Sequence, residues 1–310
     1  MRNVSLDLNL LNSDSKIFPI CVPSYNRPDA VLLNELSKNP KLPVILFIRR
    51  EQELMYKKWE KYFKIVLLDN VKDIGETRNR IVQYAIKNNH DIIFMFDDDI
   101  YKLNYLVEGY TKKGNKKLMM KSIPEEECQI GKEAMQLWTK YIEMCENLAL
   151  SGIIYRPFSW MWSNKKLKWE YNKPVAGLMQ VISVNVKLLA ENNISYKSND
   201  IVFNEDKQIV FDCLVNGLNI IQFKEFTYSV KDRLSCTGGC LDNLYNIDQE
   251  SSKQEKIEKI QSINNEGLEL FMKNVIRDHP GVTMKKDKKG NNRISFHWEN
   301  WKKPWKEVGE

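Results

Sequence analysis

The chain has 310 residues, of which 43% are hydrophobic, and a formal net charge of +6. It can bury a full hydrophobic core, either as one large domain with an appendage or as two small ones. No apolar run reaches the roughly 18 to 20 residues of a membrane span, and residues 1–15 lack the basic-then-apolar order of a signal peptide. We therefore expect a soluble cytoplasmic protein with no membrane partner. Among its six cysteines, Cys236 and Cys240 lack the further ligands of a zinc site.

The first hundred residues alternate between strand and helix patterns. Short apolar runs predict strands at residues 17–22, 43–48, 64–68 and 93–96. The segments between them predict helices at residues 30–36, 51–62 and 75–87. Repeated strand-helix-strand order predicts a parallel sheet with right-handed crossovers. The first strand is not followed by Gly-x-Gly-x-x-Gly, which excludes the dinucleotide-binding fold.

Three consecutive carboxylates, Asp97, Asp98 and Asp99, follow the apolar run at residues 93–96. Such a run is typical of a buried central strand, and ligands of open α/β sheets bind beyond the carboxyl ends of the strands. Adjacent carboxylates repel one another, so a cation or dense hydrogen bonding is needed to keep them all ionised. A hard divalent ion that also binds a diphosphate would meet this need. The alternative is a solvated acidic turn.

The rest of the chain is less regular. Residues 111–122 form a polar, lysine-rich segment that we expect to be a loop, and residues 124–150 predict a long helix. Strands are expected at 177–184 and 220–230, and helices at 186–192, at 208–216 ending at Gly217, and at 248–277. The last thirty or so residues are basic and aromatic. This composition fits either a tail that orders on a partner or a docked arm.

Two lysine clusters are interleaved with tryptophans. Lys165 and Lys166 lie near Trp160 and Trp162, and further lysines run from Lys285 to Lys306 among the last tryptophans. Basic side chains beside exposed aromatics suit a polyanion whose bases can stack. The alternative is a solvated basic surface with tryptophans in the core.

Four motifs together resemble a known fold. They are the turn at residues 23–28, the helix start at 74–79, the Phe-Asp-Asp-Asp strand end at 96–99 and Asn-Glu-Asp at 204–206. Their order and spacing resemble the GT-A fold of nucleotide-sugar glycosyltransferases. Residues 177–217 look most similar to the TET-associated glycosyltransferases, a phage and eukaryotic group thought to glycosylate oxidised pyrimidines in DNA.

The resemblance implies an α/β fold with a single Rossmann-type, mostly parallel sheet flanked by helices. It implies a GT-A-like domain at residues 1–240, with a nucleotide-sugar half at about 17–105 and an acceptor half at about 106–240. A helical, basic and aromatic extension would occupy residues 241–310. The number of subunits is left open.

The resemblance also implies roles for individual residues. Asp99 and Asp97 would bind Mn²⁺ or Mg²⁺ on the diphosphate, with His297 as a further ligand, while Asp97 and Asp98 face the ribose and base. A nucleoside-diphosphate sugar, UDP-sugar by preference, would contact Arg78, Asn79 and the turn of Pro23, Ser24, Tyr25, Asn26 and Arg27. Asp206, preferred over its neighbour Glu205, would be the catalytic base. Trp160, Trp162, Lys165 and Lys166 would contact a DNA acceptor.

Each of these motifs also has a purely structural interpretation. The proline turn can be a rigid connector, Arg78 can pair on the surface with Glu76 or Asp73, and the pair at 205–206 can belong to a helix cap. A lone histidine such as His297 is usually structural.

Three functional classes therefore stay open. They are a metal-dependent glycosyltransferase acting on DNA, a glycan or a protein; a nucleotidyltransferase or diphosphatase; and a non-catalytic nucleic-acid-binding module. A nucleotidyltransferase would carry a glycine-rich phosphate loop where this chain has Ser24-Tyr25-Asn26. A binding module has no need of the carboxylates at 97–99 and 205–206.

Overall fold

The structure is a computed structural model. It describes residues 16–110, 112–121, 123–155, 170–171, 180–198, 204–230, 252–276, 282–288 and 290–296. None of the helices in these ranges is long and apolar enough to cross a membrane.

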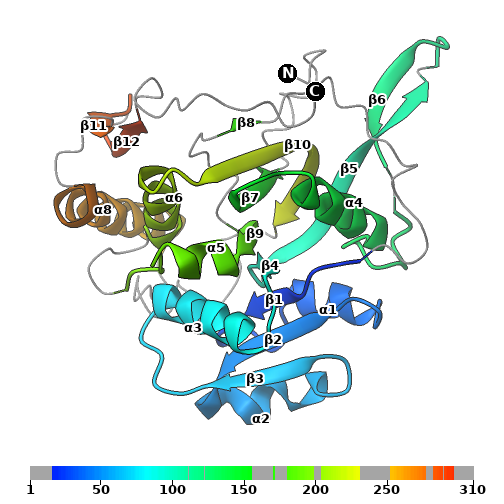
Figure 1. Cartoon of the computed structure of the whole chain (residues 1–310), viewed down its shortest axis with the longest axis horizontal. Coiled ribbons are helices and arrows are strands. Elements are labelled where there is room, and N and C mark those ends of the chain that lie inside the picture. Colours follow the sequence, from blue (N-terminus) through cyan, green and yellow to red (C-terminus); the bar gives the residue numbers. More distant parts are fainter. Residues whose placement is uncertain are drawn as a thin grey trace.

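One large sheet with strand order β3-β2-β1-β4-β9-β7-β10-β5-β6 forms the centre of the molecule (Figure 1). Its strands are β1 (Ile20–Pro23), β2 (Val44–Arg49), β3 (Lys64–Leu68), β4 (Ile92–Phe96), β5 (Ile100–Tyr110), β6 (Lys116–Met120), β7 (Leu148–Tyr155), β9 (Val181–Asn185) and β10 (Asn219–Val230). The short strand β8 (Glu170–Tyr171) pairs with β10.

The direction of the strands defines a functional edge. Strands β3, β2, β1 and β4 pair in parallel, and β10 is parallel to β7. Strand β9 runs antiparallel to both β4 and β7, so the carboxyl ends of all six parallel strands lie at the same edge of the sheet. Strands β5 and β6 continue the sheet as an antiparallel pair. The predicted α/β class with one central sheet is confirmed.

Helices cover both faces of this sheet (Figure 1). Helices α1 (Val31–Ser37) and α4 (Lys132–Glu143) pack on one face, and α3 (Ile74–Lys87), α5 (Val186–Glu191) and α6 (Glu205–Val215) on the other. Strand β4 shows why its apolar run is unbroken. Phe94 and Phe96 enter the first core, and Ile93 and Met95 enter the second.

Three of the expected elements differ from the observed ones. The expected loop at 111–122 contains β6, which pairs with β5 at the edge of the sheet, where lysine-rich sequences are common. The expected helix at 124–150 is shorter, because the β-branched and apolar residues at 148–155 form β7 in the sheet interior. The expected helix at 51–62 is broken into 3₁₀ turns at Arg50–Gln52 and Lys57–Trp59 around α2 (Glu53–Tyr56).

The C-terminal extension has a helix and a hairpin. Helix α8 (Lys253–Phe271) starts with a capping box at Ser252 and continues as a π-helical turn, Met272–Ile276. Strands β11 (Val282–Lys286) and β12 (Asn292–Phe296) pair antiparallel, so the expected tail includes regular structure. Phe271 of α8 and Val282 of β11 pack against Phe211 of α6, which ties the extension to the sheet-covering helices.

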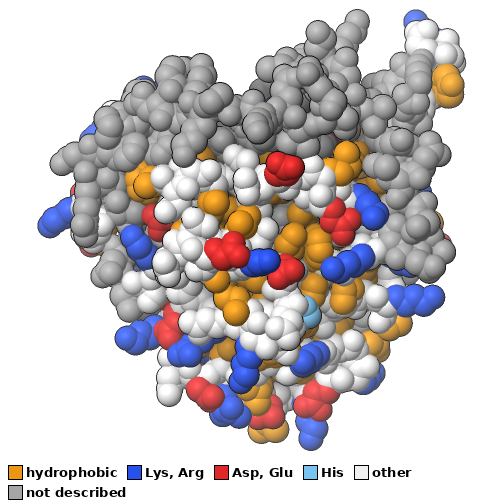
Figure 2. Space-filling model, in the orientation of Figure 1, with side chains coloured by type: hydrophobic (Ala, Val, Ile, Leu, Met, Phe, Trp, Pro, Cys, Tyr) orange, Lys and Arg blue, Asp and Glu red, His pale blue; other side chains and the backbone are white. Residues whose placement is uncertain are grey.

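Charged side chains are interspersed on the face shown in Figure 2. Lysines and arginines alternate there with aspartates and glutamates, and the described residues form no single basic patch on it. The net charge of the chain is therefore not displayed as one basic surface on this face.

Candidate active site

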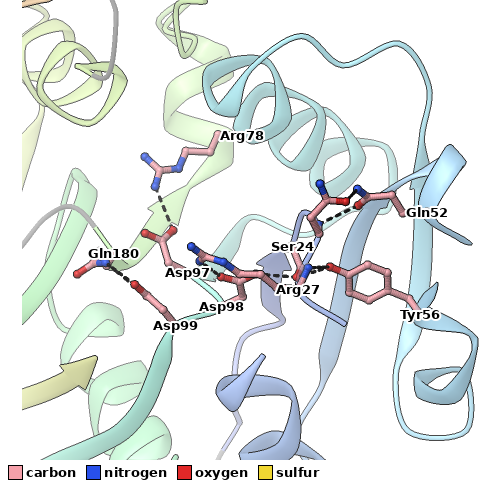
Figure 3. Close-up of polar contacts among 10 residues, drawn as sticks. Ser24, Arg27, Gln52, Tyr56, Arg78, Asp97, Asp98, Asp99 and Gln180 are labelled. Atoms are coloured by element: carbon pink, nitrogen blue, oxygen red, sulfur yellow. Dashed lines mark hydrogen bonds and ion pairs between the residues drawn. The ribbon is translucent and has the colours of Figure 1, made fainter. Parts of the chain in front are cut away.

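The three carboxylates after β4 differ in burial. Asp98 is buried, whereas Asp97 and Asp99 on either side of it are half-buried. Asp97 is fixed through its backbone, because its N–H donates to the carbonyl of Gln180 at 2.9 Å. The Gln180 amide in turn lies 3.4 Å from both oxygens of Asp99 (Figure 3). Asp97 and Asp99 are thus the partly accessible pair at the strand end.

Asp98 holds the turn that follows β1. Its carboxylate accepts hydrogen bonds from Ser24 Oγ at 2.7 Å and from Arg27 Nη1 at 2.8 Å (Figure 3). Burial raises the pKa of Asp98, while Arg27 and the Ser24 hydroxyl lower it, and the pKa remains above its ordinary value. Asp98 therefore acts on the turn at residues 23–27 rather than facing open space.

Arg78 connects the strand end with the start of α6. Its side chain is only 5% exposed, and its guanidinium donates to Asp97 Oδ1 at 3.1 Å and to Glu205 Oε1 at 2.8 Å. Burial lowers the pKa of Arg78, but the charges of Asp97 and Glu205 raise it more, so the net shift is upward. The alternative interpretation of Arg78 as a surface residue is therefore not observed. Glu76 lies instead 3.4 Å from Arg80.

Helix α3 places Arg78 at this point. Asp73 caps the helix by accepting from the N–H of Glu76 at 2.8 Å. Gly75 allows close approach to the next segment, since a Cβ there would lie 2.2 Å from the carbonyl oxygen of Lys197. The side chain of Asn79 bonds through both of its polar atoms to the backbone of Tyr196. Asn79 thus anchors the segment leading to α6.

Glu205 and Asp206 begin α6 and have different surroundings. Glu205 is buried against Arg78, whereas Asp206 is half-buried and accepts from the N–H of Lys207 at 2.9 Å. The pKa of Glu205 is raised to about 7, because burial and the charge of Asp206 raise it more than Arg78 lowers it. Of the two carboxylates, Asp206 is the one with access to a ligand.

The raised pKa of Glu205 has a measurable consequence for stability. The folded protein holds this proton up to about pH 7, whereas the ordinary pKa is 4.5, so folding is favoured at low pH and loses this contribution between about pH 4.5 and 7. We expect Glu205→Gln, which cannot ionise, to reduce the fall in Tm across this window. Thermal melts of both proteins between pH 4.5 and 7.5 test this, and parallel pH profiles would contradict it.

Two residues near the turn were not identified from the sequence. Gln52 and Tyr56 are both buried, and both contact the turn (Figure 3). The sequence feature that could have identified them is the spacing of Gln52, Tyr56 and Trp59. This spacing places a polar amide among the apolar positions on one face of the expected helix at 51–62. Gln180 was also missed, because nothing in its local pattern distinguishes it.

Some of the expected site residues cannot be compared with the structure. His297, Trp160, Trp162, Lys165 and Lys166 lie outside the described residues. The lysines at 112–113 and 285–286 are described and exposed.

The carboxylates after β4 fit a divalent ion that is also bound by a substrate. Within the described ranges, no group of three or more His, Cys, Asp or Glu side chains is arranged to enclose a metal ion. Mg²⁺ and similar ions are commonly held by one or two carboxylates plus substrate phosphates rather than by a protein cage. Asp97 and Asp99 meet that requirement.

Comparison with known proteins places the sequence in a family. The profile of the TET-associated glycosyltransferases matches residues 18–239, and no curated protein matches the chain. Similar solved structures include a mycobacterial protein with 10% identity, which covers 96% of this chain and 88% of its own, at a TM-score of 0.49. GalNAc-T7 with UDP, GalNAc and Mn²⁺ has 9% identity, coverage of 86% and 58%, and a TM-score of 0.41. A mannose-1-phosphate geranyltransferase from Thermus thermophilus has 11% identity, coverage of 68% and 75%, and a TM-score of 0.36.

The family match includes the turn after β1, Arg78, the carboxylates after β4 and the start of α6, which together form the site described above. The chain belongs to the TET-associated glycosyltransferase family and is a glycosyltransferase.

Proposed function

We propose that the protein transfers a sugar from a nucleoside-diphosphate sugar, UDP-sugar by preference, to a hydroxymethyl group on a pyrimidine in DNA. The observation that supports this proposal is that three parts of the site lie at one edge of the sheet, where the carboxyl ends of the parallel strands are. The accessible carboxylates Asp97 and Asp99, the turn after β1 and the start of α6 lie together there, and Arg78 bridges two of these parts.

The donor would lie against the turn at residues 23–27. Tyr25 is partly exposed, and the Arg49 guanidinium lies 4.1 Å from the centre of its ring. A cation on one face of an aromatic ring is favourable and leaves the other face for stacking a base. Pro23 ends β1, and Arg27 keeps its guanidinium beside Asp98.

Asp97 and Asp99 would hold Mn²⁺ or Mg²⁺ together with the donor diphosphate, and His297 is the further ligand implied by family resemblance. A divalent ion at this position would stabilise the negative charge that develops on the departing diphosphate. A bound cation would also lower the mutual repulsion of the neighbouring carboxylates Asp97 and Asp99.

Asp206 is our choice for the base that takes the proton of the attacking hydroxyl. It is half-buried at the start of α6, next to the buried pair of Glu205 and Arg78. Glu205 would then act as a positioning residue that holds Arg78 and, through it, Asp97.

Asp206→Asn should lower kcat by roughly a hundredfold or more, the usual range for losing a positioned base, while donor affinity changes little. The matched control is Asp212→Asn on the same helix, whose carboxylate bonds to Gln208 and not to the site. A collapse of donor affinity would assign Asp206 to the nucleotide site. Unchanged turnover would remove it from catalysis.

A DNA acceptor would be held partly by basic side chains. The lysine and tryptophan segments with Trp160, Trp162, Lys165 and Lys166 support this. Lys285 and Lys286 are exposed on β11. A base inside a duplex would need to be extruded to reach the site, which costs a few kcal/mol.

Affinity for duplex DNA should therefore fall steeply with salt, because bound phosphates release counterions. Lys285→Ser/Lys286→Ser should reduce the slope of log Kd against log salt by about one for each DNA phosphate that the variant no longer binds. The control is Lys41→Ser/Lys87→Ser, two exposed lysines of the N-terminal half. Equal slopes for both variants would exclude β11 from the DNA surface.

The direct test of the function is product mass. The protein would be incubated with Mn²⁺, a panel of nucleotide sugars and duplexes with or without 5-hydroxymethylpyrimidine, and the nucleosides analysed by mass spectrometry. We expect a hexosyl or pentosyl mass increase on the hydroxymethylated base alone. Transfer to glycan or protein acceptors, with the DNA unmodified, would contradict the choice of acceptor.

A further inference from the structure

The segment that begins at the end of β2 and includes α2 contacts the turn after β1 through several of its side chains. We call residues Arg49–Trp59 the clasp, a segment that contains two 3₁₀ turns and α2. The clasp bonds to the turn through Gln52 to Asn26 and through Tyr56 to Ser24 and Arg27, and Lys58 bonds to Asp29 just after the turn. The Trp59 indole donates to the carbonyl of Pro28 at 2.7 Å, and Arg49 lies over the ring of Tyr25.

The break in the helical pattern of the clasp allows these contacts. A continuous α-helix would place its side chains at 100° steps, whereas the 3₁₀ turns at residues 50–52 and 57–59 place them at steps of about 120°. Gln52, Tyr56 and Trp59 are consequently all buried against the turn or the core. The 3₁₀ turns of the clasp thus place these three side chains where they can contact the turn or the core.

The hydroxyl of Tyr56 belongs to a chain of hydrogen bonds that runs from the N–H of Arg27 through Tyr56 and Ser24 to the carboxylate of Asp98. Ser24 Oγ donates its single proton to Asp98 at 2.7 Å. Ser24 must then accept from the Tyr56 hydroxyl at 2.8 Å, and the Tyr56 oxygen accepts the N–H of Arg27 at 2.9 Å (Figure 3). Burial raises the pKa of Tyr56 to about 12, so the hydroxyl keeps its proton at neutral pH. The hydroxyls of Ser24 and Tyr56 each donate one hydrogen bond and accept one in this chain.

Gln52 holds the backbone of the turn at Asn26, which has a positive φ. Asn26 has a φ of 53°, in the left-handed region that few residues other than glycine and asparagine adopt readily. The side-chain oxygen of Gln52 accepts the N–H of Asn26 at 3.2 Å, and its amide donates to the side-chain oxygen of Asn26. The N–H and side-chain oxygen of Asn26 are therefore bound within the protein.

We propose that Tyr56 and Gln52 are positioning residues for the nucleoside diphosphate, because they hold the turn after β1 in its binding conformation before the donor arrives. This inference rests on the proposed function. It differs from the family resemblance in assigning donor affinity to buried residues of the clasp that do not touch the donor. When the turn is already ordered, donor binding does not include the free energy of ordering it. Loss of the clasp contacts should therefore weaken donor binding rather than slow the chemical step.

The test compares two tyrosine hydroxyls. Tyr56→Phe removes the hydroxyl of the chain described above. Tyr84→Phe is the matched control, because among the described residues no partner lies within hydrogen-bonding distance of its buried hydroxyl. Calorimetry with UDP and Mn²⁺ gives Kd, and steady-state kinetics gives KM and kcat.

For Tyr56→Phe we expect Kd for UDP and KM for the donor to rise roughly tenfold, which corresponds to about 1.4 kcal/mol, with kcat within a factor of about two. Tyr84→Phe should match the wild type in all three. A lower Tm for Tyr56→Phe with unchanged Kd and KM below the melting range would mean that the hydroxyl only stabilises the fold, and would overturn the proposal.

A double variant tests whether the chain acts as a unit. Ser24→Ala interrupts the same chain, so Ser24→Ala/Tyr56→Phe should raise Kd little more than either single change. Fully additive effects would contradict the linkage. If the wild type binds neither UDP nor another nucleoside diphosphate with Mn²⁺, the proposed function itself fails. If it binds and Tyr56→Phe binds equally well, only the role of the clasp fails.

Discussion

Asp99→Asn is expected to abolish metal-dependent donor binding while leaving the fold intact. Asp99 is half-buried at the end of β4 with the Gln180 amide 3.4 Å from its carboxylate, and an asparagine can occupy the same space. The amide carries no charge, so a divalent ion loses one of its two carboxylate ligands. Since such an ion stabilises several kcal/mol of developing charge, turnover should fall about a thousandfold or more.

The measurement is the thermal shift caused by UDP plus Mn²⁺, followed by turnover. The matched control is Asp91→Asn, an exposed carboxylate just before the same strand. The control should keep the full thermal shift, and Asp99→Asn should show none. Wild-type turnover by Asp99→Asn would refute the metal assignment.

Arg78→Met should have the largest effect on stability. It leaves the half-buried Asp97 and the buried Glu205 without the cation that lies between them. Removing one member of a buried charge network commonly costs about 3–5 kcal/mol, because the remaining charges are not compensated. Urea denaturation at pH 7.5 would measure this loss.

Two variants serve as controls for the Arg78 prediction. Arg80→Met lies two residues along the same helix, where Arg80 is 49% exposed and pairs with Glu76 at 3.4 Å, so its cost should stay within about 0.5 kcal/mol. Arg78→Met/Glu205→Met removes a buried carboxylate as well and should recover part of the lost stability. Equal losses for Arg78→Met and Arg80→Met would contradict the buried bridge.

The parallel half of the sheet could be predicted from the sequence because its signals are local. Strand β4 is an unbroken apolar run since both faces of the sheet are covered, and Gly217 with its φ of 73° ends α6 where a glycine was expected. The carboxylates after β4 could be recognised for the same reason, since the strand and its acidic end are contiguous.

Other features depend on contacts between distant residues, which periodicity does not encode. Arg78 and Glu205 are 127 positions apart, and nothing near Arg78 indicates that it is buried rather than paired with Glu76. Strand β6 resembles a loop because its sequence is rich in lysine and it lies at the edge of the sheet. Gln52 resembles a polar position of an exposed helix, and only the fold shows that its amide holds Asn26.

The most direct test of the donor site is a crystal structure with UDP and Mn²⁺, in which anomalous scattering locates the ion. We expect the Mn²⁺ peak beside Asp97 and Asp99, in contact with the diphosphate, with uracil against Tyr25 and the turn after β1. A peak at another carboxylate cluster, or a nucleotide bound away from the carboxyl ends of β1 and β4, would contradict this assignment.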